Sequence, residues 1–209
     1  MEEENELKEE VGYLATCLNC YDGEKTLVVP KGYSKLAAVD PELGIERIVL
    51  HEGIRSINPG SVSCKVAFVV DEGNPYLSSE NGLLYNKDKT VLLRVPAERS
   101  MMGMRLSHKL LHIGESAFAG VRGACIGVPD GVISVGERAF ANCPELVYLY
   151  LPDTVTIVGE HAFYGDDELI LFCEARSMPR GYAFSPSEVE EIRWNWSRHA
   201  PAPGGPYEA

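Results

Sequence analysis

Apolar residues recur along the chain in one register. The segments Ile113–Val121, Val135–Cys143 and Val158–Asp166 each contain the pattern Gly-Glu-x-Ala-Phe, and this pattern repeats every 22 or 23 residues. A unit this short cannot bury its own apolar face, so it must pack against its neighbours. Self-similarity at this period therefore predicts a solenoid built from stacked repeats.

The stretch that precedes the third copy predicts a short strand. Residues 146–151 follow an L-x-x-L-x-L pattern. Because side chains alternate across a strand, Leu149 and Leu151 are expected to point inward, and Tyr148 and Tyr150 outward.

The residues after this strand predict a turn and a returning arc. Pro152 ends the strand because it has no backbone donor. Gly159 is expected to adopt a backbone angle that other residues resist, and Glu160 to open a short helix, where free N–H groups favour a carboxylate. Ala162 and Phe163 are expected to fill the space between strand and arc.

The same alternation predicts six inward-facing pairs that share a single continuous apolar spine. Successive pairs lie 20 to 23 residues apart, except for one step of 36 residues. That longer step contains a predicted hairpin with strands at 83–85 and 91–95 and turn residues at 86–89. The pairs are Leu27/Val29, Ile48/Leu50, Phe68/Val70, Met104/Leu106, Ile126/Val128 and Leu149/Leu151.

With its proline-ended strands and I/V-G-E-x-A-F blocks, the chain resembles the BspA-type leucine-rich repeat family over about residues 21–196. Asn74–Pro96 is similar to a hairpin that interrupts a repeat in this family. Leu171–Tyr182 and Glu191–Trp194 resemble its closing segment. The resemblance implies an α/β repeat solenoid: a right-handed leucine-rich-repeat coil of short parallel strands with short helical or irregular arcs, plus an inserted β-hairpin.

The expected domain organisation follows from the need to cover the open ends of a solenoid. Residues 1–20 form an acidic N-terminal segment and cap, and residues 21–173 form the repeats, with the hairpin at about 74–96. Residues 174–196 form a C-terminal cap. Residues 197–209, rich in proline and glycine, have the composition of a disordered tail.

Charge and hydropathy limit which partners and which cell compartment we expect for this chain. The net charge of −12 argues against nucleic acid and anionic membranes, which attract basic surfaces. No apolar run is long enough to span a bilayer, which predicts no transmembrane segment. The acidic start is unlike the basic start of a signal peptide. We expect a cytoplasmic protein as the sequence is written, or a secreted or cell-surface protein if the N-terminus is truncated.

Candidate chemistry is sparse. Cys17 and Cys20 form an isolated C-x-x-C without the further ligands that zinc requires, so we expect a structural pair in the N-terminal cap. The remaining cysteines are expected to be mainly free buried thiols. Residues 166–168 are interpreted as a solvated turn rather than a calcium site. No catalytic set stands out, so the sequence predicts no enzyme, cofactor or metal; the alternative is a site in a pocket near Tyr85.

The remaining candidate surface is the outward face of the strands. Six strands give a ribbon of roughly 300 Å², which fits a peptide or glycan and is smaller than a standard protein interface of about 800 Å² per partner. A folded partner therefore also requires the flanking turns or the hairpin. The outward residues are Thr26, Val28, Arg47, Val49, Ala67, Val69, Gly103, Arg105, Cys125, Gly127, Tyr148 and Tyr150.

Within this face, the predicted binding residues are Arg47, Val49, Arg105, Tyr148 and Tyr150. The two tyrosines are the strongest anchors, because tyrosine brings contact area at low entropic cost. Ordinary β-propensity on an exposed strand explains them equally well. The sequence thus predicts a non-catalytic module that binds protein, peptide or glycan through the strand face and flanking loops. The alternative is a cell-surface adhesin or passive repeat array of a larger secreted protein; the oligomeric state stays open.

Overall fold

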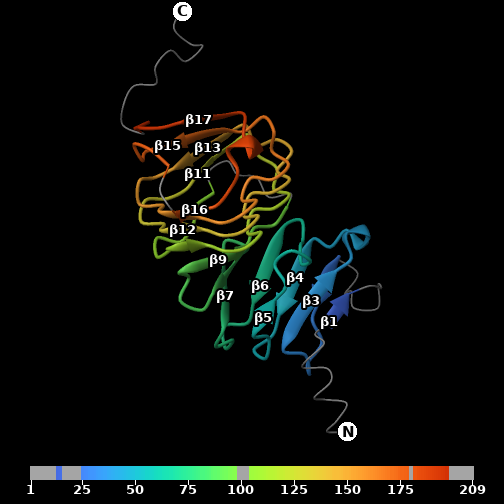
Figure 1. Ribbon diagram of the computed structural model, residues 1–209. Helices are drawn as coiled ribbons and strands as arrows, with labels where there is room; N and C mark the ends of the chain where they lie inside the picture. Colours follow the sequence, from blue (N-terminus) through green and yellow to red (C-terminus); the bar gives the residue numbers. More distant parts are fainter. Residues whose placement is uncertain (1–12, 16–24, 98–103, 179–180, 198–209) are drawn as a thin grey trace, which may run out of the picture.

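The computed structural model describes residues 13–15, 25–97, 104–178 and 181–197. The chain winds into a β-solenoid of about eight turns with parallel strands (Figure 1). In the described ranges, helical structure is limited to two short 3-10 turns, η2 (Pro41–Leu43) and η3 (Pro186–Glu188). The predicted repeat solenoid is confirmed, and its arcs are irregular.

The N-terminal coils contribute strands to two three-stranded parallel sheets. Leu27, Ile48 and Phe68 lie in register across one sheet and are all buried. This sheet contains β2 (Thr26–Val28), β4 (Arg47–Leu50) and β6 (Ala67–Val70), and the other contains β1 (Tyr13–Ala15), β3 (Lys35–Val39) and β5 (Ser56–Ile57).

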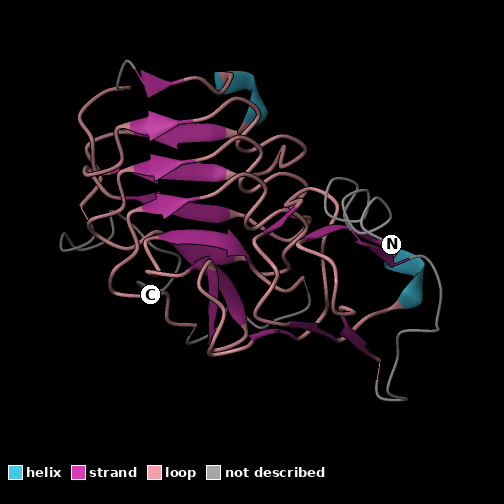
Figure 2. Cartoon of the chain, turned by 90° about the horizontal axis from the view of Figure 1, so that it is seen from below, coloured by secondary structure: helices cyan, strands magenta, loops and turns pink. Residues whose placement is uncertain are grey.

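The C-terminal coils stack in the same manner, and their strands lie one above another in Figure 2. Ile126, Leu149 and Leu171 are in register and buried, as an alternating inward face requires. A four-stranded sheet contains β11 (Cys125–Gly127), β13 (Tyr148–Leu151), β15 (Ile170–Cys173) and β17 (Glu191–Arg193). The second row contains β10 (His112–Ile113), β12 (Ser134–Val135), β14 (Ile157–Val158) and β16 (Gly181–Tyr182).

A three-stranded antiparallel insertion connects the two sets of coils. It consists of β7 (Leu77–Glu80), β8 (Leu83–Asn86) and β9 (Val91–Arg94), and β9 pairs in parallel with β10. The strands β8 and β9 were predicted, but β7 was not. The turn between β7 and β8 is Asn81-Gly82, and both residues have positive φ, at 52° and 76°. An Asn-Gly pair between apolar runs is a strong hairpin signal, so the sequence did contain evidence for β7.

Asn74 fixes the start of this insertion to the preceding coil. Its side-chain nitrogen donates to the carbonyl oxygens of His51 and Ile54, at 2.9 and 2.8 Å. Its side-chain oxygen accepts from the backbone N–H groups of Tyr76 and Leu77, both at 2.8 Å. The side-chain amide of Asn74 is fully buried, and it makes four hydrogen bonds to the backbone.

The insertion also divides the apolar core, which corrects the prediction of one continuous spine. Leu83 and Tyr85 on β8 belong to the core of the C-terminal coils, whereas Leu84 belongs to the core of the N-terminal coils. Successive residues of a strand point to opposite faces, so β8 contributes to both cores at once. The predicted stacking holds within each set of coils, and the two cores meet at the hairpin.

The Gly-Glu-x-Ala-Phe motif forms the tight turn between a strand and the returning arc. The variable third residue has positive φ, 53° at Ser116, 52° at Arg138 and 54° at His161. Gly159 does not have a positive φ, so its predicted backbone role is wrong. A Cβ on Gly159 would lie 2.5 Å from the backbone nitrogen of Glu137. The glycine is required because successive coils approach closely at this point.

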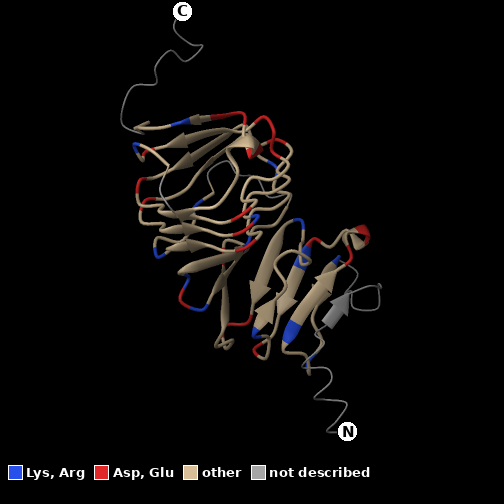
Figure 3. Ribbon diagram, in the orientation of Figure 1, with Lys and Arg blue, Asp and Glu red and all other residues tan. Residues whose placement is uncertain are grey.

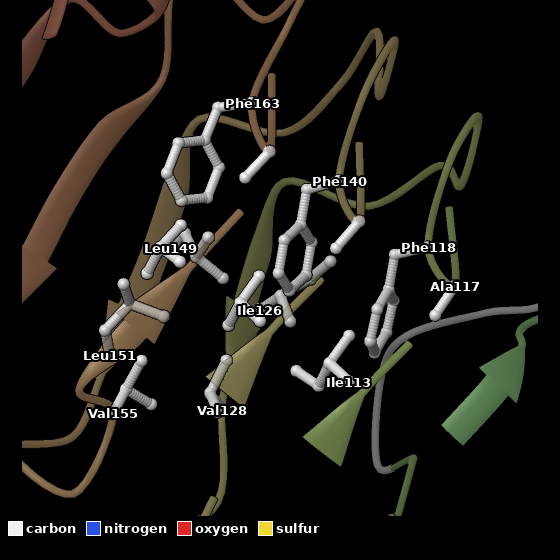
Figure 4. Packing of buried hydrophobic residues seen from close by; sticks show 14 of the residues in the cluster. Ile113, Ala117, Phe118, Ile126, Val128, Phe140, Leu149, Leu151, Val155 and Phe163 are labelled. Atoms are coloured by element: carbon white, nitrogen blue, oxygen red, sulfur yellow. The ribbon is translucent and has the colours of Figure 1, made fainter. Parts of the chain in front are cut away.

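The phenylalanines of the motif form a ladder through the C-terminal core, as Figure 4 shows. The rings of Phe118 and Phe140 are 4.8 Å apart between centroids, and those of Phe140 and Phe163 are 6.1 Å apart. Phe184 ends the ladder with an edge-on contact to Phe163 at 4.8 Å. Since all four side chains are buried, the repeated phenylalanine is architectural.

Three smaller predictions need correction. Met104 and Leu106 pack against the C-terminal core as predicted, but they are only partly buried and lie outside any strand. Thr26, assigned to the outward face, is 6% exposed. Glu160 lies in a turn and not in a helix. Of the cysteines, Cys17 and Cys20 lie outside the described residues.

Among the described cysteines, three are buried free thiols, as predicted, and one is an exposed free thiol. The buried ones are Cys64, Cys143 and Cys173, and the exposed one is Cys125.

Candidate functional site

Four aromatic side chains gather on the outer face of the C-terminal four-stranded sheet, and we call this cluster the aromatic platform. It consists of Tyr148 and Tyr150 on β13, Phe172 on β15, and Trp196, which follows β17. The ring of Tyr150 lies 4.9 Å from that of Phe172 and 4.7 Å from that of Trp196. Phe172 lies 5.3 Å from Trp196 and 6.0 Å from Tyr148. The four rings therefore form one contiguous layer.

Strand register explains why these rings meet. Tyr150 pairs with Phe172 across the two neighbouring parallel strands, so both side chains project from the same face. Their neighbours Leu149 and Leu171 point into the core. Trp196 reaches the layer because its backbone N–H donates to the carbonyl oxygen of Cys173 at 3.1 Å.

The platform remains partly accessible to solvent. Tyr148 is 40% exposed, Tyr150 and Trp196 are half-buried, and Phe172 is nearly covered by the surrounding rings. Tyr148 and Tyr150 were predicted as outward-facing anchors, and the structure brings them together. Phe172 and Trp196 were missed as members of this surface.

Beside the platform, the positive charge of Arg193 is paired with the negative charge of Glu191. The Arg193 guanidinium lies 5.2 Å from the centre of the Phe172 ring, at a distance typical of a cation–π contact. Its Nε and Nη2 donate to the two carboxylate oxygens of Glu191 at 2.9 and 2.8 Å. This hydrogen bonding lowers the pKa of Glu191. Figure 3 shows that charged residues lie mainly at turns and loops, and β11, β13 and β15 carry none.

The other predicted binding residues lie elsewhere. Arg47 and Val49 are on β4, in a different sheet from β13. Val49 is in register with Val28 and Val69, so that sheet has its own apolar outer face. Arg105 is exposed but lies outside any strand. The five predicted residues therefore do not form one surface.

A cleft of about 580 Å³ lies beside the hairpin, and its lining includes Asp40, Ser61, Ser63 and Arg94. Arg94 is 6% exposed, and its Nη1 donates to the carbonyl oxygen of Ser116. Burial lowers the pKa of this guanidinium. The cleft thus has a buried cation at its wall.

Tyr85, near which the sequence suggested an alternative site, is a residue of the C-terminal core. Tyr85 is fully buried, its hydroxyl accepts from the backbone N–H of Ser107 at 3.3 Å, and burial raises its pKa to about 12. Burial raises the pKa of the Cys64 and Cys143 thiols to about 12 as well, which disfavours reactive thiolates. Among the described residues, no group of three or more His, Cys, Asp or Glu side chains is placed to hold a metal ion.

The predicted solvated turn at 166–168 has one buried member. Asp167 and Glu168 are exposed, but Asp166 is only 4% exposed. Its Oδ1 accepts from the backbone N–H of Cys143 at 2.6 Å, and its Oδ2 is buried without a hydrogen-bond partner. Burial raises the pKa of this carboxyl to about 7.

We expect Asp166 to make the stability of the fold depend on pH. The folded state binds this proton more tightly than the unfolded state, whose pKa is 3.8. The stabilisation is therefore complete below about pH 4 and is lost as pH rises through about 7. Asp166→Asn keeps an acceptor for Cys143 and removes the charge, so it should raise the unfolding free energy at pH 8 by roughly 2 to 4 kcal/mol.

Urea denaturation from pH 4 to pH 8 measures this effect. The exposed Glu168→Gln is the matched control, because Glu168 does not contribute to the raised pKa of Asp166, and it should keep the pH dependence of the wild-type protein. An unchanged pH dependence in Asp166→Asn would show that this carboxyl ionises normally in the fold.

Comparisons with known proteins agree with this architecture. Residues 97–196 match the model of the BspA type leucine rich repeat region, with six copies. No curated protein sequence matches the chain significantly. In the described part of the chain, no helix is long and apolar enough to cross a membrane.

Three solved structures share the fold. A leucine-rich repeat protein from Eubacterium ventriosum is 19% identical, with a TM-score of 0.62 over 80% of this chain and 47% of its own. The pneumococcal vaccine antigen PcpA is 17% identical, with a TM-score of 0.55 over 81% of this chain and 56% of its own. A leucine-rich cell surface protein from Faecalibacterium prausnitzii is 16% identical, with a TM-score of 0.53 over 83% and 60%.

At these identities the likeness shows the fold alone, and the chain spans about half to three-fifths of each of these proteins. Their names add that the fold occurs in bacterial leucine-rich repeat proteins. The repeat register and the stacked parallel strands agree with the family model over residues 97–196, so this part of the chain is similar to the BspA-type leucine-rich repeat family.

Proposed function

We propose that this chain is a non-catalytic module that binds a protein or peptide partner through the aromatic platform and the loops beside it. Leucine-rich repeat proteins are generally interaction modules and are typically not enzymes. The observation that carries the proposal is the contiguous layer formed by Tyr148, Tyr150, Phe172 and Trp196. Aromatic side chains supply large contact areas at low entropic cost and dominate binding energy in many interfaces.

The size and charge of the platform favour an extended ligand. The face of this four-stranded sheet covers roughly 200 Å², which is too small for a folded partner unless the flanking loops also take part. Arg193, whose guanidinium lies over the Phe172 ring, is already paired with Glu191. An extended segment with apolar side chains therefore suits the platform better than an acidic one.

Affinity capture with the purified full chain tests this function. A Tyr148→Ala/Tyr150→Ala variant should lose at least about tenfold of a specifically captured partner, because two central rings are removed. Tyr164→Ala is the matched control, since Tyr164 is 56% exposed and does not belong to the platform. Equal capture by all three proteins would contradict a role for the platform.

A second candidate is a role at the bacterial cell surface, as part of a longer protein. Two fold neighbours are a leucine-rich cell surface protein and a pneumococcal vaccine antigen, and both are longer than this chain. The partner would then be a protein or glycan of a host or neighbouring cell. Protease treatment of intact producing cells distinguishes the two locations: a surface protein is cleaved, whereas an internal protein is protected.

A further inference from the structure

The aromatic platform has the chemistry of a surface that binds proline. Aromatic-lined surfaces bind proline-rich segments in the polyproline II conformation, which is already extended and loses little entropy on binding. In the platform, the rings of Tyr150 and Trp196 are 4.7 Å apart and inclined by 39°. Phe172 lies beside both and is stacked on Tyr150 with an angle of 23° between the ring planes. Adjacent rings at different inclinations offer apolar contacts on the scale of one pyrrolidine ring.

The charge balance of this surface selects an uncharged ligand. Glu191 neutralises Arg193 through two hydrogen bonds. The strands β11, β13 and β15 of this sheet carry no charged residue (Figure 3), and β17 carries only the paired Glu191 and Arg193. An acidic or basic segment would therefore give up hydration of its charge without finding an ion partner in return.

The chain itself contains such a segment immediately after the platform. Ala200–Tyr207 has the sequence A-P-A-P-G-G-P-Y, with three prolines and no charged side chain. Pro201 follows Trp196 by five residues, and five residues span up to about 17 Å when extended. The rings of the platform lie 4.7 to 6.0 Å from one another, so the first prolines are within reach of the platform.

We propose that the proline-rich segment 200–207 docks on the aromatic platform of its own chain. The inference rests on the proposed function, because it takes the platform to be a binding surface. The short tether gives an effective concentration on the order of millimolar, so a contact with a Kd below about a millimolar is mostly occupied. The docked segment competes with an external partner for the same rings and thereby lowers the apparent affinity of the platform for that partner.

Nuclear magnetic resonance of the full chain tests this contact. The wild-type protein should show contacts between the ring protons of Pro201 or Pro203 and those of Trp196 or Tyr150. Tyr150→Ala should release the segment, so that its resonances move to random-coil positions, whereas the control Tyr164→Ala should leave them in place. Random-coil resonances for residues 200–207 in the wild-type protein would overturn the proposal.

A competition experiment separates this proposal from the proposed function. The probe is a synthetic peptide of residues 199–209, added to the full chain and to a Pro201→Ala/Pro203→Ala/Pro206→Ala variant. The peptide should bind the variant several-fold more tightly, because the tethered segment no longer occupies the rings. Equal affinities would overturn tail docking. The tyrosine-dependent capture experiment decides the proposed function independently, since it depends on an external partner.

Discussion

Phe140→Ala is expected to lower the free energy of unfolding by about 3 to 5 kcal/mol, the range found for removing a buried phenylalanine. Phe140 is fully buried at the middle of the phenylalanine ladder, between Phe118 and Phe163. Alanine would leave a cavity that reaches two neighbouring coils. Because each coil packs only on its neighbours, this loss weakens the coupling between the coils on either side.

Urea denaturation with two probes measures the loss and its location. The chain has two tryptophans, Trp194 and Trp196, and both lie at the C-terminal end of the solenoid. Their fluorescence therefore reports the coils that contain the ladder, whereas far-ultraviolet circular dichroism reports both sets of coils. The fluorescence transition should move to lower urea than the circular dichroism transition.

Phe140→Leu provides the matched control for this position. It keeps an apolar side chain of intermediate size and should cost clearly less than the alanine variant. A loss below about 1 kcal/mol for Phe140→Ala would show that the ladder contributes little to stability. Coincident fluorescence and circular dichroism transitions would instead show that the two cores unfold as one unit.

The sequence predicted that the phenylalanines of the ladder are buried, because an apolar residue that recurs at the same position of each repeat is expected to face the shared core. The phenylalanines of the three complete motifs are all buried, and so are the inward leucines of β13. Phe184, the fourth rung, lacks the preceding Gly-Glu and was missed. The remaining signal was its spacing, since Ala183-Phe184 lies 21 residues after the Ala162-Phe163 pair.

The division of the core was not predictable from periodicity. The alternation on β8 shows that Leu83 and Leu84 face opposite ways, but not that each face meets a different set of coils. That outcome depends on where the insertion lies between β6 and β10, which is a property of the assembled structure. The same division places Arg47 and Tyr148 in different sheets, although both lie at outward positions of a repeat.

The candidate site was predictable in part, because strand alternation and repeat spacing determine which side chains face outward together. Alternation placed Tyr148 and Tyr150 on the outer face, and the 22-residue step from Tyr150 gave the signal for Phe172. Trp196 follows no repeat position. It reaches the platform through a hydrogen bond to Cys173, and contacts between distant residues of this kind cannot be inferred from one sequence.

Gly159→Ala is expected to destabilise the fold by about 3 kcal/mol, because a methyl group there overlaps the backbone of the preceding coil. The added Cβ would lie 2.5 Å from the nitrogen of Glu137 and 2.8 Å from the carbonyl carbon of Gly136. If the two coils moved apart to remove this overlap, the hydrogen bond between them from the Gly159 N–H to the carbonyl oxygen of Val135, which is 2.9 Å long, would be disturbed. Gly136 is placed in the same way, because a Cβ there would lie 2.7 Å from the nitrogen of Glu115.

Gly127→Ala is the control that isolates this effect. Gly127 lies on β11 in the same stack, its φ is not positive, and nothing lies within 4 Å of an added Cβ. Alanine there reduces the entropy of the unfolded chain and should stabilise the fold by about 0.4 to 1 kcal/mol. Urea denaturation should thus move in opposite directions for two chemically identical substitutions. If both variants lie within about 0.5 kcal/mol of the wild-type protein, the coils have room to separate at Gly159, and close approach is not why the motif requires glycine.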